Sequence, residues 1–116
     1  MKSKNNKVNV LEACVGKGQS LISLVEYASD SIVSKTILDS SVGTITLFAF
    51  DAGQKLSEHI SPYNAVVQVI DGTGHFIIDG DAVGVSAGEL LIMPADIPHS
   101  VQAKEKFKML LTMIRA

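Results

Sequence analysis

Closely spaced turn residues divide most of this chain into short segments with the composition of β-strands. From residue 31 onward, Gly, Pro and Asp recur roughly every 8–12 residues, and the segments between them are rich in Val, Ile, Thr and Phe. The dipeptide Asp79-Gly80 is typical of a two-residue hairpin turn. Many short strands joined by such turns predict a β-sandwich or a β-barrel.

Several segments have the composition or the alternation of a strand: 32–38, 44–50, 56–60, 65–70, 75–78, 82–86, 89–93, 99–103 and 107–113. No long amphipathic helix separates them, which excludes a parallel sheet built from β-α-β units. Residues 21–27 fit either a short helical turn or a first edge strand. We therefore expect an irregular lead-in or edge strand over residues 1–30 and one all-β barrel domain over residues 31–116.

The composition adds expectations about partners and location. Hydrophobic residues make up 47% of the 116 residues. One small core cannot bury so large a share, so we expect the remaining apolar surface to form the interface of a homodimer. A net charge of −2 argues against a nucleic-acid partner. No apolar run approaches the ~18 residues needed to span a membrane. The single cysteine, Cys14, cannot form an intrachain disulfide, and we expect a cytoplasmic protein.

Two stretches combine a glycine turn, a histidine and a proline. The first, GQKLSEHISPYNAVVQVIDG, runs from Gly53 to Gly72 and contains His59. The second, GELLIMPADIPH, runs from Gly88 to His99. Each stretch thus places a histidine beside a proline-bearing kink.

These two stretches resemble the two motifs of the cupin superfamily, and in particular its small single-domain bacterial members. In the first motif Gly53, His59 and Gly72 fall on the family frame, with Ser61 at the second histidine position and Ala65 at the glutamate position. In the second, the matching residues are Gly88, Pro94 and His99, with Asp96 at the glycine position and Ala103 at the asparagine position. The resemblance covers residues 43–114 and implies a double-stranded β-helix, or jelly-roll, barrel.

The resemblance also implies a metal site, and this chain departs from it. The family holds a metal with three histidines and a glutamate, of which His59 and His99 remain. Tight transition-metal sites in proteins use at least three protein ligands, so these two histidines form an incomplete site for Fe, Mn, Ni, Cu or Zn. Among the neighbours that might replace the lost ligands, Glu58 and Asn64 are expected to face away from the pocket, whereas Asp96 lies in a loop near the barrel mouth.

The predicted ligand pocket consists of His59, Ser61, Tyr63, Met93 and His99. Tyr63 fits the pocket mouth or a packing role equally well, and Met93, Met109 and Met113 suit core packing. Such a pocket predicts a binding module for a small organic molecule, with weak or no metal. The alternative is a metal-dependent enzyme of the dioxygenase, isomerase or decarboxylase type, in which the ion acts as a Lewis acid. A structural dimer with a vestigial pocket is the third hypothesis.

Overall fold

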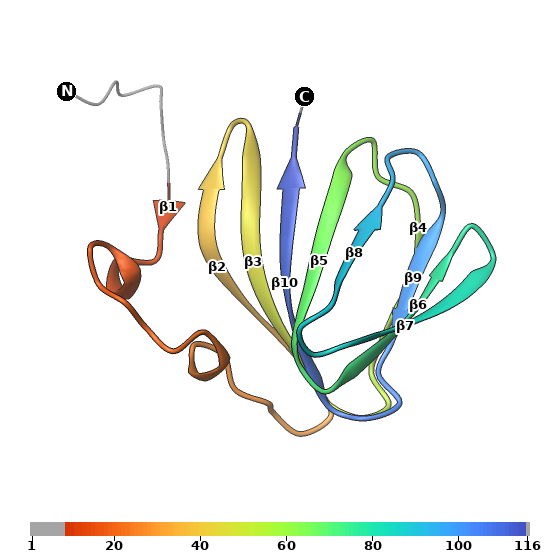
Figure 1. The fold of residues 1–116 in the computed structure, drawn as a ribbon, viewed down its shortest axis with the longest axis horizontal. Helices are drawn as coiled ribbons and strands as arrows, with labels where there is room; N and C mark the ends of the chain where they lie inside the picture. The colour runs from red at the N-terminus through yellow and green to blue at the C-terminus, as the bar shows by residue number, and fades with distance from the viewer. Residues whose placement is uncertain (1–8, 116) are drawn as a thin grey trace.

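The computed structural model describes residues 9–115, and they form ten antiparallel strands and two short 3-10 turns (Figure 1). In chain order these elements are β1 (Asn9–Val10), η1 (Glu12–Cys14), η2 (Leu21–Ser23), β2 (Ile32–Ser40), β3 (Gly43–Phe50), β4 (Lys55–His59), β5 (Asn64–Asp71), β6 (Thr73–Ile78), β7 (Asp81–Ser86), β8 (Leu90–Met93), β9 (His99–Gln102) and β10 (Phe107–Ile114). The all-β prediction is confirmed. The helical segments within residues 9–115 are single turns, and none has the length and apolar character needed to cross a membrane.

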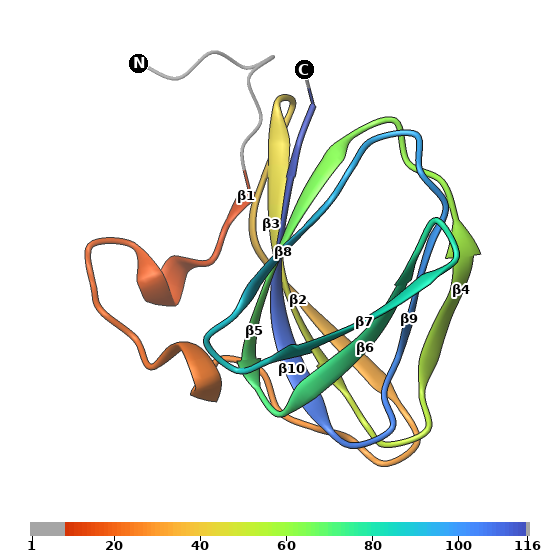
Figure 2. The same ribbon diagram turned by 45° about the vertical axis from the view of Figure 1, so that its right-hand side comes forward.

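The strands form two sheets that face each other. One has six strands in the order β1-β2-β3-β10-β5-β8, and the other has four in the order β4-β9-β6-β7. Figure 2 shows the two sheets opening from a common lower edge, with the four-stranded sheet on the right. Sequence neighbours are often not sheet neighbours: β10 lies between β3 and β5, and β9 lies between β4 and β6. The residues near His59 and His99 therefore come from strands that are far apart in the chain.

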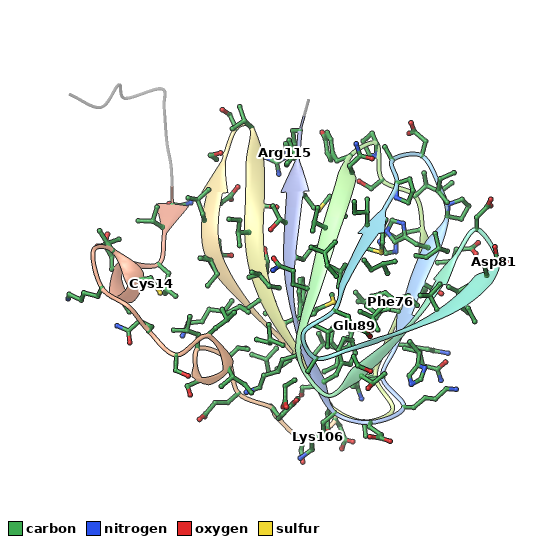
Figure 3. All side chains as sticks on the ribbon, viewed as in Figure 1. Cys14, Phe76, Asp81, Glu89, Lys106 and Arg115 are labelled. Carbon is green, nitrogen blue, oxygen red and sulfur yellow. The ribbon has the colours of Figure 1, made fainter. Side chains whose placement is uncertain are left out.

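The inner faces of the two sheets meet in an aromatic core. Phe50 and Phe107 stack with ring centroids 4.6 Å apart, and Phe76 approaches Phe107 edge-on at 6.2 Å. Phe76, labelled in Figure 3, is fully buried between the sheets. Gly74 lets these rings approach, because a Cβ at that position would lie 2.7 Å from Cε2 of Phe107. This core fills the lower end of the barrel and leaves the upper end for a cavity.

The segment before β2 covers part of the outer face of the six-stranded sheet. Val25 is buried against Leu47 and Ala49, which point outward from β3. Nζ of Lys108 donates a 2.7 Å hydrogen bond to the carbonyl of Ile22. Residues 21–23 form the short helical turn that was one of the two sequence-based alternatives, and the chain contributes an edge strand earlier, where β1 pairs with β2. We call residues 21–27 the strap.

Candidate functional site

His59 and His99 meet at the end of the antiparallel pair β4 and β9. The two residues are direct partners in the ladder, their ring centroids are 4.3 Å apart, and the rings meet edge to face at 73°. His99 is buried at 4% exposure, whereas His59 is exposed. The site therefore has one imidazole inside the barrel and one at its mouth.

A β-bulge places His59 rather than Glu58 opposite His99. Leu56 pairs with Val101 and His59 pairs with His99, so β4 carries three steps where β9 carries two. An unbroken ladder would set Glu58 against His99, because partners advance one residue at a time along both strands. The extra residue keeps Leu56 and His59 on the same inward face despite their odd spacing.

Backbone carbonyls orient both imidazoles in the same way. Nδ1 of His59 lies 2.8 Å from the carbonyl oxygen of Ser57, and Nδ1 of His99 lies 3.1 Å from that of Ile97. A carbonyl oxygen only accepts, so each Nδ1 carries the proton and donates it. In the neutral rings, Nε2 is then the acceptor on both histidines. Within residues 9–115, Nε2 of His99 has no protein partner, and it is not sealed from solvent.

Both imidazoles line an apolar cavity of about 120 Å³. The rest of the lining comes from both sheets and from the loop after β4, and it consists of Phe48, Leu56, Ser61, Ala65, Met93, Val101, Met109, Leu111 and Met113. No charged side chain belongs to this lining. Ala65 sits between Met93 and Met113 in the inner row of β8, β5 and β10. The cavity is thus a small apolar space with two imidazoles and one hydroxyl.

Burial and a second imidazole keep His99 neutral. Loss of solvation lowers the pKa of His99 below its ordinary value, the hydrogen bond to the Ile97 carbonyl partly offsets this, and repulsion from His59 lowers the pKa further. His99 therefore carries no charge near pH 7. A neutral Nε2 acceptor inside an apolar cavity attracts a hydrogen-bond donor and gives no ionic attraction to an anion.

Four of the five predicted pocket residues line this cavity, and Tyr63 does not. His59, Ser61, Met93 and His99 are in the lining. The backbone N–H of Tyr63 instead donates a 3.2 Å hydrogen bond to Oγ of Ser61, and the Tyr63 ring packs under the guanidinium of Arg115, 5.8 Å from its centroid. Tyr63 therefore has the packing role, which was one of the two alternatives that the sequence left open. Sequence reasoning missed four lining residues, which are Phe48, Leu56, Val101 and Met113. The alternation of residues in β3 and β10 places Phe48 and Met113 on the inner face.

The residues present do not fit a tight transition-metal site. Among the described residues no group of three or more His, Cys, Asp and Glu side chains comes together. Glu58 is exposed and does not belong to the cavity lining, and the side-chain oxygen of Asn64 accepts a 2.9 Å hydrogen bond from the N–H of Ala95. Asp96 is exposed, adopts a φ of 64°, and donates its N–H to the Ser61 carbonyl at 2.8 Å. Two imidazole nitrogens are therefore the only strong metal ligands that line the cavity.

Fold and site together define a small antiparallel β-barrel with an internal histidine-bearing cavity. The family model for the cupin domain matches residues 46–115. The chain belongs to the cupin domain family, and its fold is a jelly-roll cupin barrel, as the sequence predicts.

Solved structures agree with this assignment. A conserved protein of unknown function from Streptococcus pyogenes is 33% identical, with 94% of each chain covered and a TM-score of 0.86. A cupin 2 conserved barrel domain protein from Leptotrichia buccalis is 38% identical over 82% of this chain and 46% of its own, with a TM-score of 0.79. Salicylate 1,2-dioxygenase from Pseudoaminobacter salicylatoxidans shares the fold alone, at 16% identity over 74% of this chain and 27% of its own and a TM-score of 0.67. A search of curated proteins finds no match.

Proposed function

We propose that this cupin binds a small, neutral, mainly apolar molecule that donates a hydrogen bond to the His59–His99 pair. The observation that carries the proposal is which nitrogen of each imidazole donates and which accepts a hydrogen bond. Both Nδ1 atoms are engaged by carbonyls, which leaves two Nε2 acceptors beside an otherwise apolar cavity. A few placed polar groups in an apolar pocket are typical of small-molecule sites.

The cavity volume restricts the size of this molecule. A dry cavity of about 150 Å³ in another protein holds benzene, and the cavity here measures about 120 Å³. A ligand held wholly inside is therefore no larger than a six-membered ring. Because His59 is exposed at the mouth, a polar substituent of a longer ligand can extend past it into solvent.

The charge of the cavity restricts the chemistry of the ligand. Its lining has no lysine or arginine, and the pKa of His99 is lowered. A carboxylate would lose its hydration without gaining an ion pair, which is costly in an apolar space. A phenol, an alcohol or an azole N–H meets the two acceptors without that cost. We therefore place phenols and small alcohols above carboxylic acids as ligands.

A metal-dependent enzyme is the second candidate. Its support is the orientation of the two imidazoles by backbone carbonyls, which is common for histidines that bind metals. An ion held by His59 and His99 would be exchangeable, because two protein ligands leave most of its coordination to water. Such an ion would act as a Lewis acid in dioxygenase, isomerase or decarboxylase chemistry. The choice between the two candidates depends on the measured metal content.

Calorimetry and thermal denaturation of protein without a polyhistidine tag test the first candidate. At a phenol concentration 100 times its Kd, binding adds about 2.7 kcal/mol, and the Tm rises by roughly 10 °C. Benzoate, which has the same ring and a carboxylate, should leave the Tm unchanged at pH 7.5. The response should be lost in His99→Leu and kept in His75→Leu, because His75 lies outside the cavity lining.

Metal analysis of the same preparation separates the two candidates. If the protein is a binding module, dialysed protein should contain less than one transition-metal ion per chain, and phenol should still raise its Tm. Stoichiometric Fe, Mn, Ni, Cu or Zn that disappears in His59→Ala would favour the enzyme. A chain that responds neither to metals nor to any neutral donor would contradict both candidates and leave the barrel with a vestigial pocket.

A further inference from the structure

Sulfur and nitrogen donors line the same cavity from opposite sheets. Met93, Met109 and Met113, which are three of the four methionines of the chain, line it together with His59 and His99. The thioethers come from β8 and β10 of the six-stranded sheet, and the imidazoles come from β4 and β9 of the four-stranded sheet. Sulfur atoms therefore add to the two imidazole nitrogens as donors for a metal ion that accepts soft ligands.

Strand register sets two of these methionines on either side of Ala65. Ala65 in β5 is the direct partner of Met93 in β8 and of Met113 in β10. The Cβ atoms of direct partners lie about 4.5–5.5 Å apart, and the long, flexible side chain of methionine extends past the single methyl group of an alanine. Met109 lies four residues from Met113 along β10, which places it about 13 Å further down the sheet. Met93 and Met113 are therefore the two thioethers that can share one ion.

The orientation of the imidazoles suits the same ion. The carbonyls of Ser57 and Ile97 accept hydrogen bonds from Nδ1 of His59 and of His99, which leaves Nε2 of each ring as its ligand atom. Imidazole nitrogen binds copper, and thioether sulfur is a soft donor that selects Cu(I), whereas Mg²⁺, Ca²⁺ and Mn²⁺ prefer oxygen ligands. The donor set in this cavity is thus the one that Cu(I) prefers.

The lack of charge in the lining favours a monovalent ion. Among the described residues that line the cavity there is no aspartate, glutamate, lysine or arginine. Neutral imidazoles and thioethers do not neutralise a bound cation, so the cost of taking the ion out of water decides which ion binds. That cost rises with the square of the charge, and a divalent ion of the same size is roughly four times as costly to bury. The cavity therefore favours Cu(I) over Zn²⁺ and Cu²⁺.

We propose that the cavity binds one Cu(I) ion through Nε2 of His59, Nε2 of His99 and the sulfur atoms of Met93 and Met113. His99 and Met93 are each 4% exposed, so the ion is held inside the barrel. His59 is exposed at the mouth, where the ion enters. This proposal does not depend on the neutral ligand proposed above, although the ion and that ligand compete for the same Nε2 atoms.

Competition with a Cu(I) chelator tests this site. The full chain without a tag is dialysed and carries Cys14→Ser, which removes its only thiol. It is titrated without oxygen with Cu(I), supplied as the acetonitrile complex, against bathocuproine disulfonate. We expect one Cu(I) per chain, and X-ray absorption at the copper edge should show both sulfur and nitrogen neighbours. In a separate titration Zn²⁺ should bind at least about 100-fold more weakly.

Leucine substitutions isolate the thioethers, because leucine conserves the apolar volume of methionine. Met93→Leu combined with Met113→Leu should lower the affinity for Cu(I) at least about 100-fold. Met109→Leu is the matched control: it removes a thioether from the same lining, far from Ala65, and should leave the affinity unchanged. Circular dichroism shows whether each variant is folded. If the double variant fails to fold, Met93→Leu alone decides the question, with an expected loss of at least about 10-fold.

Several outcomes would overturn the proposal. They are a chain that retains no Cu(I) against the chelator, an affinity that the double methionine variant keeps, copper without sulfur neighbours, and Zn²⁺ that binds as tightly as Cu(I). The Tm response to phenol is measured on copper-free protein. Binding of the neutral ligand and binding of Cu(I) are therefore separate results, and either one can fail without the other.

Discussion

His59 lies directly opposite His99 in the β4–β9 ladder because β4 holds one more residue than β9 between the Leu56–Val101 pair and the histidine pair. The same bulge supplies the Ser57 carbonyl that orients His59 through Nδ1. The irregular backbone thus does two things at once: it brings the second imidazole to the cavity and fixes its tautomer. His99, the buried member of the pair, has its pKa lowered chiefly by loss of solvation.

The stability of the fold should fall at mildly acidic pH because of His99. The folded-state pKa of His99 lies below its ordinary value, so the unfolded chain binds this proton more readily than the folded chain. The free energy of unfolding therefore decreases as pH falls below about 6.5 and levels off below the folded-state pKa, with a slope of at most ~1.4 kcal/mol per pH unit. Urea denaturation between pH 8 and pH 5 measures this slope.

The contribution of His99 is isolated by comparing variants. His99→Asn keeps a side-chain N–H that can reach the Ile97 carbonyl but removes the titrating group, so its denaturation midpoint should depend less on pH than that of the wild type. His75→Asn, which changes a histidine outside the cavity, should keep the wild-type dependence. Equal pH dependence in wild type and His99→Asn would contradict this account.

The sequence predicts the fold well because turns and alternation are local properties. The Asp79-Gly80 hairpin joins β6 and β7 where the dipeptide indicates, and strand β10 alternates Phe107, Met109 and Leu111 on its inner face as predicted. His59 and His99 could be paired from sequence because both motifs match one family frame. Strand pairing itself depends on the whole sheet, so the position of β10 between β3 and β5 comes only with the structure.

Features that depend on strand register or on long-range contacts could not be predicted from the sequence. A bulge is not visible in residues 56–59, because no Gly or Pro marks it. Tyr63 lies at the expected place in the chain, but its ring packs with Arg115, which is far along the sequence and follows β10. Lys108 and Asp71 hold the strap through hydrogen bonds. The sequence does not indicate that these two residues contact residues 21–27.

Tyr27 should anchor the strap through its hydroxyl. The Tyr27 hydroxyl donates a 2.6 Å hydrogen bond to the Asp71 carboxylate. Loss of that bond in Tyr27→Phe leaves a half-buried carboxylate without its donor and should lower the free energy of unfolding by about 1–2 kcal/mol. Tyr63→Phe is the control, since the Tyr63 hydroxyl makes no hydrogen bond within residues 9–115. Urea denaturation at pH 7 compares the two variants, and equal losses would contradict the anchoring role.

Tyr27 should also ionise at unusually high pH. Desolvation, together with the hydrogen bond and charge of Asp71, raises the pKa of Tyr27 well above its ordinary value of about 10. In Tyr63→Phe the remaining tyrosine should therefore show no phenolate absorbance at 295 nm at pH 11, provided that the chain stays folded. In Tyr27→Phe the remaining tyrosine is Tyr63, and its absorbance serves as the reference. A phenolate signal at pH 10 in folded Tyr63→Phe would rule out this environment.

Lys108 should hold the strap against local opening. Its ammonium is buried, donates to the Ile22 carbonyl at 2.7 Å, and lies 4.9 Å from the centroid of the Tyr27 ring. Lys108→Met keeps the stem but removes the donor, so amide exchange in residues 21–27 should accelerate while the core strands stay protected. Lys106→Met is matched, because Lys106 also approaches the Tyr27 ring, at 5.5 Å, but is exposed. Faster exchange throughout the barrel would point to a global loss of stability instead.

Restoring the two family ligands should convert the cavity into a metal site. Ser61 and Ala65 line the cavity with His59 and His99, so Ser61→His with Ala65→Glu would supply four ligands. Without metal, the new carboxylate at position 65, where alanine is 2% exposed, should cost about 2–4 kcal/mol because it is buried without a cation. Zn²⁺ or Mn²⁺ should reverse that loss, since an ion bound only by the folded chain stabilises it.

The Tm of the double variant should change in a definite direction both without metal and when metal is added. In EDTA its Tm should lie below that of the wild type, and addition of Zn²⁺ should raise it by more than 10 °C, whereas the wild type should change by a few degrees at most. Ser61→His alone keeps the cavity uncharged and should show an intermediate response. If Zn²⁺ stabilises the wild type as strongly as the double variant, then His59 and His99 bind metal well without a carboxylate, and the metal-dependent enzyme becomes the better account of this cavity.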